Sequence, residues 1–220
     1  MKALRFERSI PKYAAARIAG ALAPGKGARF GPLSLVDTDD PELPGPQWRY
    51  VRPLLAGICG SDLSTVDGKS SRYFEPIVSF PFVPGHEVVG ELDDGTRVVI
   101  EPVLACAARG ITPLCRACAA GDKGRCGNLA HGHITPGLQT GYCESTGGGW
   151  STLFVAHDDQ VHAVPTALDD DQAVMIEPTA CAVHGVLRAQ VPKGALAVVI
   201  GAGTLGLLAV AALRHLSKPK

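Results

Sequence analysis

Apolar residues occur in short runs along most of the chain, and glycine and proline separate the runs. The run from Trp48 to Leu55 predicts a β-strand, and residues 57–68 predict a turn followed by a short helix. The segment 81–90 contains proline and glycine and ends in an apolar stretch that predicts the start of another strand. Residues 101–129 have no periodicity, so we expect an excursion that something other than an apolar core holds together.

Strand-like patterns return after three consecutive glycines, over residues 151–156 and 160–164. These strands are expected to rejoin the first ones in a single domain. Three aspartates at 169–171 then supply a helix N-terminus, where acidic side chains are favourable. The mostly apolar stretch 173–186 predicts the helix itself, with Pro178 as a candidate kink. A second part of the chain is therefore expected to begin near residue 166.

The last apolar run, residues 195–213, approaches the length of a membrane span. Three glycines divide it into a β-branched piece and a piece rich in alanine and leucine. This division favours a buried strand over 195–200, a turn over 201–206 and a buried helix over 207–216. We therefore predict a soluble strand-turn-helix unit at this position and no contact with a membrane.

Composition and charge narrow the possible functions. The 21 basic and 21 acidic residues cancel, and no stretch is rich in lysine or arginine, so nucleic acid is not an expected partner. The 26 glycines and 17 prolines favour a loop-rich fold with many short strands. The first eight residues lack the apolar core of a secretory signal, and the seven cysteines are then expected to be reduced thiols in the cytoplasm.

Four of these cysteines lie in the aperiodic segment. Cys115, Cys118 and Cys126 have the spacing C-x2-C-x7-C, and Cys106 precedes them. Four thiolates satisfy one tetrahedral zinc ion, and a closed four-cysteine set is the usual structural zinc site. The alternative is a loop with unrelated buried cysteines, and Cys106 is the member that the spacing supports least.

A second group of reactive residues comes from two separate segments. The first carries Cys59, Ser61 and Asp62, and the second carries His86 and Glu87. A cysteine and a histidine brought together from two segments suit a catalytic zinc ion, which keeps one position open for substrate or water. Asp62 would accept a hydrogen bond from the second ring nitrogen of the histidine, as carboxylates near zinc usually do. Taken alone, each residue also fits an ordinary structural role.

The motifs GICGSDL, PFVPGHEVVG and GAGTLG and the cysteine lobe occur in the order typical of one family. In this respect the chain resembles the medium-chain zinc-dependent alcohol, polyol and threonine dehydrogenases from about residue 45 onward. The resemblance implies a mainly β, GroES-like barrel as the catalytic domain over residues 1–165, with the zinc lobe at 101–129. It also implies that 166–220 holds the first βα unit of an α/β Rossmann domain.

The resemblance also implies roles at the catalytic zinc. Cys59 and His86 would be zinc ligands, and Glu87 would be the neighbouring carboxylate that approaches or replaces a ligand. Glu177 would be the third ligand, directly or through water, because the sequence Met-Ile-Glu-Pro around it is similar to the polyol-type members. Cys181 is the competing third ligand, because other members use a cysteine in this region.

Two further residues concern proton transfer. Ser61 resembles the hydroxyl that carries the substrate proton outward in the family. A histidine that often ends this relay is replaced here by Ser64. Proton exit is therefore expected to run through water or another residue.

The motif of residues 201–206 has the form G-x-G-x-x-G and would hold the pyrophosphate of a nicotinamide cofactor on backbone N–H groups at a helix N-terminus. The candidate cofactor-binding residues are Gly201, Gly203, Thr204, Leu205 and Gly206. The alternative is a tight strand-to-helix turn in a core. NAD and NADP are not separated, because the acidic residue that reads the ribose is expected about 20 residues beyond the motif.

The function expected from the resemblance is hydride transfer between an alcohol or polyol and NAD or NADP, with zinc as Lewis acid. A Rossmann domain needs about six strands, so the chain resembles a truncated enzyme, which in complete form is expected to be a homo-oligomer. The 220 residues are then expected to bind zinc without the turnover of a complete dehydrogenase. The alternative is a zinc-binding, GroES-like module without catalysis.

Overall fold

The computed structural model describes residues 1–23 and 25–218. The strands are β1 (Lys2–Phe6), β2 (Leu33–Asp37), β3 (Trp48–Ala56), β4 (Val88–Leu92), β5 (Arg97–Ile100), β6 (Phe154–His157) and β7 (Val161–Ala163). The α-helices are α1 (Ile10–Leu22), α2 (Gly27–Phe30), α3 (Gly60–Val66), α4 (Arg116–Ala119), α5 (Asp170–Ala173), α6 (Ile176–Ala189) and α7 (Thr204–Leu216). Three 3-10 turns complete the elements: η1 (Arg72–Ile77), η2 (Lys123–Arg125) and η3 (Asp158–Gln160).

The main sheet curls upon itself. Its five antiparallel strands follow the order β6-β3-β4-β5-β7, and β1 pairs with β2 in a separate hairpin. The two edge strands β6 and β7 are separated in sequence only by the three residues of η3. The edges of a flat five-stranded sheet would lie roughly 19 Å apart, whereas four residue steps span at most about 14 Å. The edges must therefore approach one another, which confirms the predicted barrel-like β architecture.

One buried side chain stabilises this closure. Gln160 lies in η3 and is almost fully buried. Its side-chain amide donates to the carbonyl oxygens of Glu101 and Pro102 at 3.1 Å, and its oxygen accepts from the backbone N–H of His157. Where the two edges meet, buried backbone N–H and carbonyl groups have no partner strand. The Gln160 side chain pairs with them instead, and buried polar groups need such partners.

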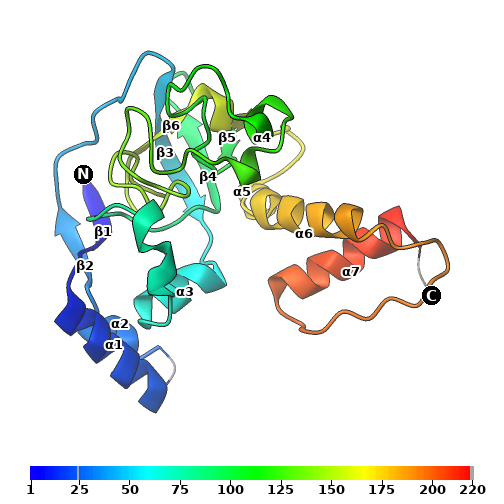
Figure 1. Ribbon diagram of the computed structural model, residues 1–220, viewed down its shortest axis with the longest axis horizontal. Coiled ribbons are helices and arrows are strands. Elements are labelled where there is room, and N and C mark those ends of the chain that lie inside the picture. Colours follow the sequence, from blue (N-terminus) through cyan, green and yellow to red (C-terminus); the bar gives the residue numbers. More distant parts are fainter. Residues whose placement is uncertain (24, 219–220) are drawn as a thin grey trace.

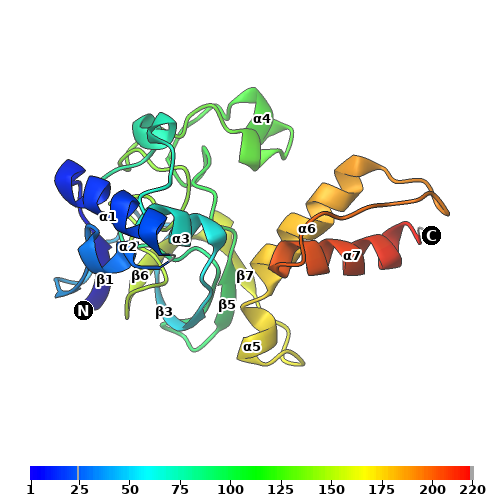
Figure 2. The ribbon, with the colours of Figure 1, turned by 90° about the horizontal axis from the view of Figure 1, so that it is seen from below.

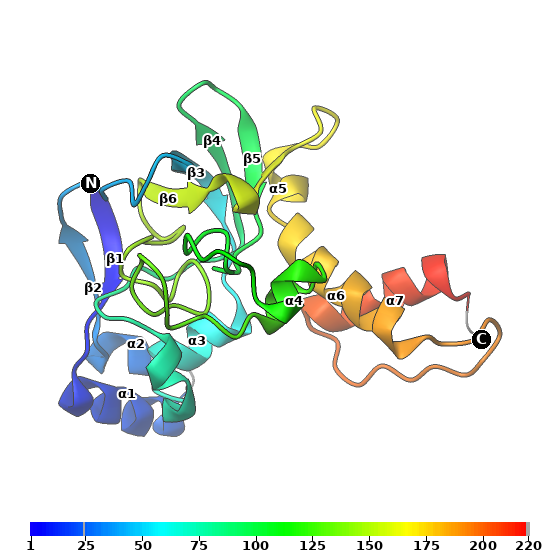
Figure 3. The same ribbon diagram turned by 45° about the horizontal axis from the view of Figure 1, so that its top comes forward.

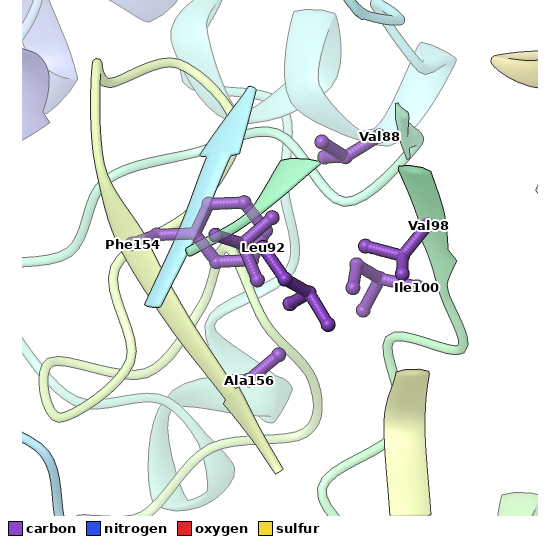
Figure 4. Packing of buried hydrophobic residues seen from close by; sticks show 7 residues of the cluster. Val88, Leu92, Val98, Ile100, Phe154 and Ala156 are labelled. Atoms are coloured by element: carbon purple, nitrogen blue, oxygen red, sulfur yellow. The ribbon is translucent and has the colours of Figure 1, made fainter. Parts of the chain in front are cut away.

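The curled sheet encloses an apolar core. Figure 4 shows side chains from β4, β5 and β6 pointing toward one another, with the Phe154 ring beside Leu92. The cluster consists of Val51, Val88, Leu92, Val98, Ile100, Phe154 and Ala156. Val89 and Val99, on the opposite face, are also buried, against residues that follow β7. Because both faces of β4 and β5 are covered, these strands have nearly continuous apolar sequences.

Most predicted elements of the first 165 residues are present. The strand predicted from Trp48 to Leu55 is β3, the predicted short helix is α3, and the apolar stretch after His86 is β4. The segment 101–129 contains only α4 and η2, in agreement with its lack of periodicity. The prediction of one helix over 173–186 was wrong in detail. The chain forms two helices, α5 and α6, and Pro178 lies in the first turn of α6, where its missing N–H breaks no bond.

The end of the chain differs more from the prediction. Residues 195–200, all within the described part of the chain, form no strand, and Ile200 is 96% exposed. A strand needs a partner for its backbone groups, and none of the described residues pairs with this segment. The segment runs back along α6 and α7, which point the same way at one end of the molecule (Figures 1 and 2). Leu213 is buried between these helices, whereas Leu205 and Leu207 are exposed. No helix in the described part of the chain combines the length and apolar content that a membrane span requires.

The connection between β1 and β2 was not predicted. It covers residues 7–32 and carries α1 and α2, which lie beside α3 at the edge of the barrel (Figures 1 and 3). Hairpin connections usually have two to five residues, so this connection is an elaboration with structure of its own. Its residues, with many alanines and exposed apolar side chains, show little amphipathic pattern.

Arg109 joins the segments at the base of the cysteine lobe. It is 0% exposed, and its guanidinium donates to the carbonyl oxygens of Leu104, His131, Thr135 and Gly137 at 2.6 to 3.3 Å. These carbonyl groups come from loops that have no sheet to pair with. A single planar side chain with five donors therefore replaces secondary structure here.

We predict that Arg109→Leu lowers the free energy of unfolding by about 3 kcal/mol, because several buried carbonyl groups lose their partner. Arg116→Met is the control, since Arg116 is exposed and its replacement is expected to change stability by less than about 0.5 kcal/mol. Urea unfolding of the zinc-loaded proteins measures both effects. Equal stability of the two variants would show that Arg109 does not organise these loops.

Candidate metal centres

The four cysteines of the lobe lie together. The sulfur atoms of Cys106, Cys115, Cys118 and Cys126 all lie within 4.8 Å of one another. Cys115 is the N-cap of α4, Cys118 lies within this helix, and Cys126 follows η2. The sulfur of Cys126 lies 3.6 Å from that of Cys106 and 4.0 Å from that of Cys115. Sulfur atoms bound to one tetrahedral zinc ion are about 3.8 Å apart, from a zinc-sulfur bond of about 2.3 Å.

The surroundings of the sulfurs favour the thiolate at Cys106 and Cys115, whose pKa values are lowered, and disfavour it at Cys118. The backbone N–H of Cys115 and the side-chain amide of Asn128 donate to the sulfur of Cys106, and the backbone N–H of Asn128 donates to Cys126. Hydrogen bonds from the backbone of Cys118 and of Gly127 lower the pKa of Cys115 to about 6. Burial, together with the neighbouring thiols, raises the pKa of Cys118 to about 12. Four adjacent thiolates repel one another, so a bound cation is needed to deprotonate the whole set.

The second group lies at the ends of two paired strands. Ligand atoms of Cys59, His86 and Glu87 lie within 4.8 Å of one another. Cys59 is the N-cap of α3, three residues after β3, and His86 and Glu87 immediately precede β4. The antiparallel pairing of β3 with β4 ends at Ala56 opposite Val88. Residues just beyond this pair on either strand are therefore neighbours.

A glycine allows the close approach of the two loops. The backbone N–H of Gly57 donates to the carbonyl oxygen of Glu87 at 2.7 Å. A Cβ atom on Gly57 would meet the Glu87 side chain, with its own Cβ only 2.9 Å away. Any larger residue at 57 would push the carboxylate of Glu87 away from Cys59 and His86.

Asp62 links the two candidate ligands Cys59 and His86. One of its carboxylate oxygens accepts from the backbone N–H of Cys59 at 3.1 Å. The other lies 3.5 Å from Nδ1 of His86, and both of these buried atoms otherwise lack a hydrogen-bond partner among the described residues. Burial lowers the pKa of His86, but hydrogen bonds and charge from Asp62 and Cys59 outweigh it and raise the pKa to about 9. The carboxylate thus orients the ring so that Nε2 remains for another partner.

Glu177 and Cys181 line the same cavity as the Cys59 cluster, from α6. They are one helical turn apart, and the thiol of Cys181 donates to the carboxylate of Glu177 at 3.4 Å. Burial and the Glu177 charge raise the pKa of Cys181 to about 11, so this thiol favours its neutral form. Glu177 is not among the three residues whose ligand atoms lie within 4.8 Å of one another. The geometry brings Glu87 closest to Cys59 and His86 and leaves the choice of third ligand open.

Hydroxyl groups near Ser61 form a network that the sequence did not reveal. The Thr65 hydroxyl donates to the carbonyl oxygen of Ser61 at 2.9 Å and lies 2.8 Å from the Ser70 hydroxyl and 3.2 Å from that of Tyr142. Ser64 also lines the cavity. Tyr142 is about 80 residues from the others in sequence, and no local motif marks it. Only the folded chain shows its proximity.

The glycine motif forms the predicted turn at the start of α7. Gly201 has a φ of +112°, and a Cβ on Gly206 would lie 2.9 Å from the carbonyl carbon of Gly201. Thr204 and Leu205 are the first residues of the helix, whose N-cap is Gly203. The turn is present, but residues 195–200 before it do not form the expected strand.

We predict that Cys115→Ser or Cys118→Ser lowers the melting temperature of the zinc-loaded chain and removes one zinc ion, because structural zinc contributes folding free energy directly. Cys143→Ser is the control. It also removes a thiol, but Cys143 lies outside both clusters, so the zinc content is expected to stay the same. Metal analysis and thermal unfolding measure the two effects. An unchanged melting temperature and zinc content in the lobe variants would contradict the assignment of the lobe.

Comparison with known proteins agrees with this architecture. Residues 45–166 match the model of the alcohol dehydrogenase GroES-like domain. Sorbitol dehydrogenase of Halalkalibacterium halodurans is 28% identical over 176 residues, which are 76% of this chain and 45% of that protein. D-xylulose reductase A of Aspergillus oryzae is 30% identical over 194 residues, which are 81% of this chain and 49% of that protein. The chain thus spans about half the length of the curated relatives it matches.

Solved structures show the same fold. The alcohol dehydrogenase of Aeropyrum pernix superimposes with a TM-score of 0.71 and 25% identity, over 100% of this chain and 57% of that chain. Galactitol-1-phosphate dehydrogenase of Escherichia coli gives a TM-score of 0.69 and 22% identity, over 99% and 53% of the two chains. The match to the family model covers more than half of the sequence. The chain therefore belongs to the alcohol dehydrogenase GroES-like domain family.

Proposed function

We propose that this chain is the metal-binding part of a zinc-dependent oxidoreductase that transfers hydride between an alcohol or polyol and NAD or NADP. The observation that carries the proposal is the convergence of Cys59, His86 and Glu87 beside a large cavity. The names of the relatives, sorbitol dehydrogenase and D-xylulose reductase, support an alcohol or polyol as substrate. We further propose that residues 1–165 form the catalytic domain and that 166–220 begin the nucleotide-binding domain.

The donor set suits zinc. Cys59 supplies a thiolate, His86 a ring nitrogen, and either Glu177 or Glu87 a carboxylate oxygen, all types that zinc accepts. With three protein ligands, a zinc ion would keep one coordination position for substrate or water. We favour Glu177 as the third ligand, directly or through water, with Glu87 as the carboxylate that approaches or replaces a ligand. Cys181 is the alternative.

A zinc ion in this position would polarise the alcohol oxygen and lower its pKa, so that hydride can leave the carbon for the nicotinamide. The chain's own residues prepare this step. Asp62 holds the His86 ring through its Nδ1 side and fixes the backbone of Cys59. Ser61 is proposed to accept the alcohol proton. In the absence of a histidine at 64, we propose that the proton leaves through water or a neighbouring hydroxyl group.

The nucleotide would be held by the turn of residues 201–206, through backbone N–H groups at the N-terminus of α7. The alternative function, a zinc-binding module without catalysis, has one observation in its favour. Residues 195–200 form no strand, and Leu196, Val198 and Ile200 are exposed. The described residues therefore do not form the sheet that would support a nucleotide on this turn. A titration with NADH and NADPH tests the turn directly, because saturable binding of either cofactor would favour the oxidoreductase over a module without catalysis.

We predict two zinc ions per chain, and we expect Cys59→Ser or His86→Ala to remove one and leave the ion in the lobe. The reason is that the two clusters share no residue. Metal analysis after growth with ample zinc measures the number of ions. Loss of both ions in either variant would contradict two independent centres, and a wild-type content below one ion would contradict both.

The third ligand has a separate test. We expect Glu177→Ala to weaken zinc binding at the Cys59 centre by about tenfold or more, and Cys181→Ala to weaken it less, because the sequence around Glu177 resembles that of the polyol-type members. Competition with a chromophoric chelator measures the affinity of the weaker site. The opposite order would assign the third ligand to Cys181.

A further inference from the structure

We propose that the first residues of α1 form the outer wall of the substrate site, and that this wall selects alcohols with a bulky apolar group, such as a phenyl ring, over linear polyols. The inference rests on the proposed function and names the substrate class of that site. It starts from the connection of residues 7–32 between the paired strands β1 and β2.

The connection packs closely against the residues that follow α3, the helix whose N-cap is Cys59. Gly68, just after α3, has a φ of +66°, and a Cβ there would lie 2.7 Å from the carbonyl oxygen of Tyr13. A Cβ on Gly27 would lie 2.8 Å from the Cα of Asp67. The hydroxyl of Tyr13 also donates to the carbonyl oxygen of Ser70 at 2.6 Å. Glycine at 68 and 27 thus allows close backbone packing, and the start of α1 has a fixed position relative to Cys59.

The same residues line the cavity of the candidate metal centre. This cavity has a volume of about 590 Å³ and reaches from Cys59 and His86 to Ile10 and Tyr13. That volume exceeds what a small alcohol needs and falls in the range of pockets for drug-sized ligands. The connection therefore contributes directly to the space in front of the metal ligands.

A row of aromatic rings leads from this wall to the metal centre. Phe6 stacks on Phe82 with ring centroids 5.0 Å apart, and Phe82 lies 5.2 Å from the ring of Tyr142. The Tyr142 ring lies 6.1 Å from that of His86. All four rings line the cavity. Phe6 and Phe82 are almost fully buried and support the cavity from below. Phe80, which packs on Phe82 with ring centroids 5.3 Å apart, and Phe74 line the cavity with accessible apolar area that a ligand can contact.

Several polar groups of the cavity bond to one another. The hydroxyls of Thr65, Ser70 and Tyr142 form the network described above. At the opening, Glu75 accepts from both Arg8 and Arg72. These groups have partners within the protein, which lowers their capacity to bind the hydroxyls of a ligand.

The consequence is a site suited to one hydroxyl. A linear polyol carries a hydroxyl on every carbon, and those placed against the aromatic row would lose their bonds to water without replacement. An alcohol with one hydroxyl near His86 and an apolar group against Phe80 and Ile10 would lose none. Burial of that apolar group would be favourable instead.

The test is a binding titration of the zinc-loaded 220-residue chain with benzyl alcohol and with sorbitol, followed by ligand-observed NMR. We expect the Kd of benzyl alcohol to be at least tenfold lower than that of sorbitol. Ile10→Gln is expected to raise it about fourfold, the order of one lost methylene contact. Ile18→Gln is the matched control, since Ile10 and Ile18 are 67% and 65% exposed on the same helix and only Ile10 lines the cavity.

The outcomes separate this inference from the function on which it rests. Tighter or equal binding of sorbitol, the same effect from both variants, or no saturable binding of benzyl alcohol would each overturn the inference. Metal analysis on the same samples tests the metal centre itself. Two bound zinc ions with a preference for sorbitol would contradict only the apolar selection, whereas a single zinc ion that Cys59→Ser does not remove would contradict the proposed function.

Discussion

The antiparallel pairing of β3 with β4 is the constraint on which the candidate metal centre depends. The pairing ends at Ala56 opposite Val88, and this register places the turn that carries Cys59 beside the turn that carries His86 and Glu87. Because side chains alternate between the faces of a strand, a slip by one residue would turn the core side chains of β4 outward and separate the ligands. The packing of Phe154, Leu92 and Ile100 inside the curled sheet fixes this register. The apolar core and the metal centre are thus consequences of the same strand pairing.

The cysteine lobe follows a different principle. Over residues 101–129 the chain has two very short helical elements, and its buried cluster consists of four cysteines and four aliphatic residues. The cysteine side chains and the N–H groups that donate to them thus make up half of what holds this segment together. Arg109 connects this region to the barrel by satisfying carbonyl groups of the loops. We propose that a cation in the lobe, together with the buried guanidinium beside it, organises a segment that hydrophobic burial alone does not organise.

The sequence predicted what depends on local spacing. The cysteine pattern from Cys115 to Cys126, the apolar run of β3 and the glycine turn before α7 each reflect a nearby physical requirement, and all are present. Contacts between distant segments were not predictable in this way. Tyr142 and the start of α1 reach the cavity only through the three-dimensional arrangement.

The strand predicted over 195–200 shows the limit of pattern analysis most clearly. Its apolar, β-branched sequence is suited to a central strand of a parallel sheet, but a strand is stable only where neighbours accept its backbone hydrogen bonds and cover its side chains. Among the described residues no strand lies beside it, and Ile200 is almost fully exposed. The sequence pattern of a segment shows which neighbours it is suited to pack against. Whether the segment forms a strand depends on whether those neighbours are present.

The most direct test of the account is X-ray diffraction from crystals of the zinc-loaded chain, measured on both sides of the zinc absorption edge. The account predicts two anomalous peaks. One peak would lie about 2.3 Å from each of the four lobe sulfurs, and the other about 2.3 Å from the sulfur of Cys59 and about 2.1 Å from a ring nitrogen of His86. A peak in the lobe alone, with Cys59 and His86 in hydrogen-bonding contact and no metal between them, would contradict the proposed catalytic centre.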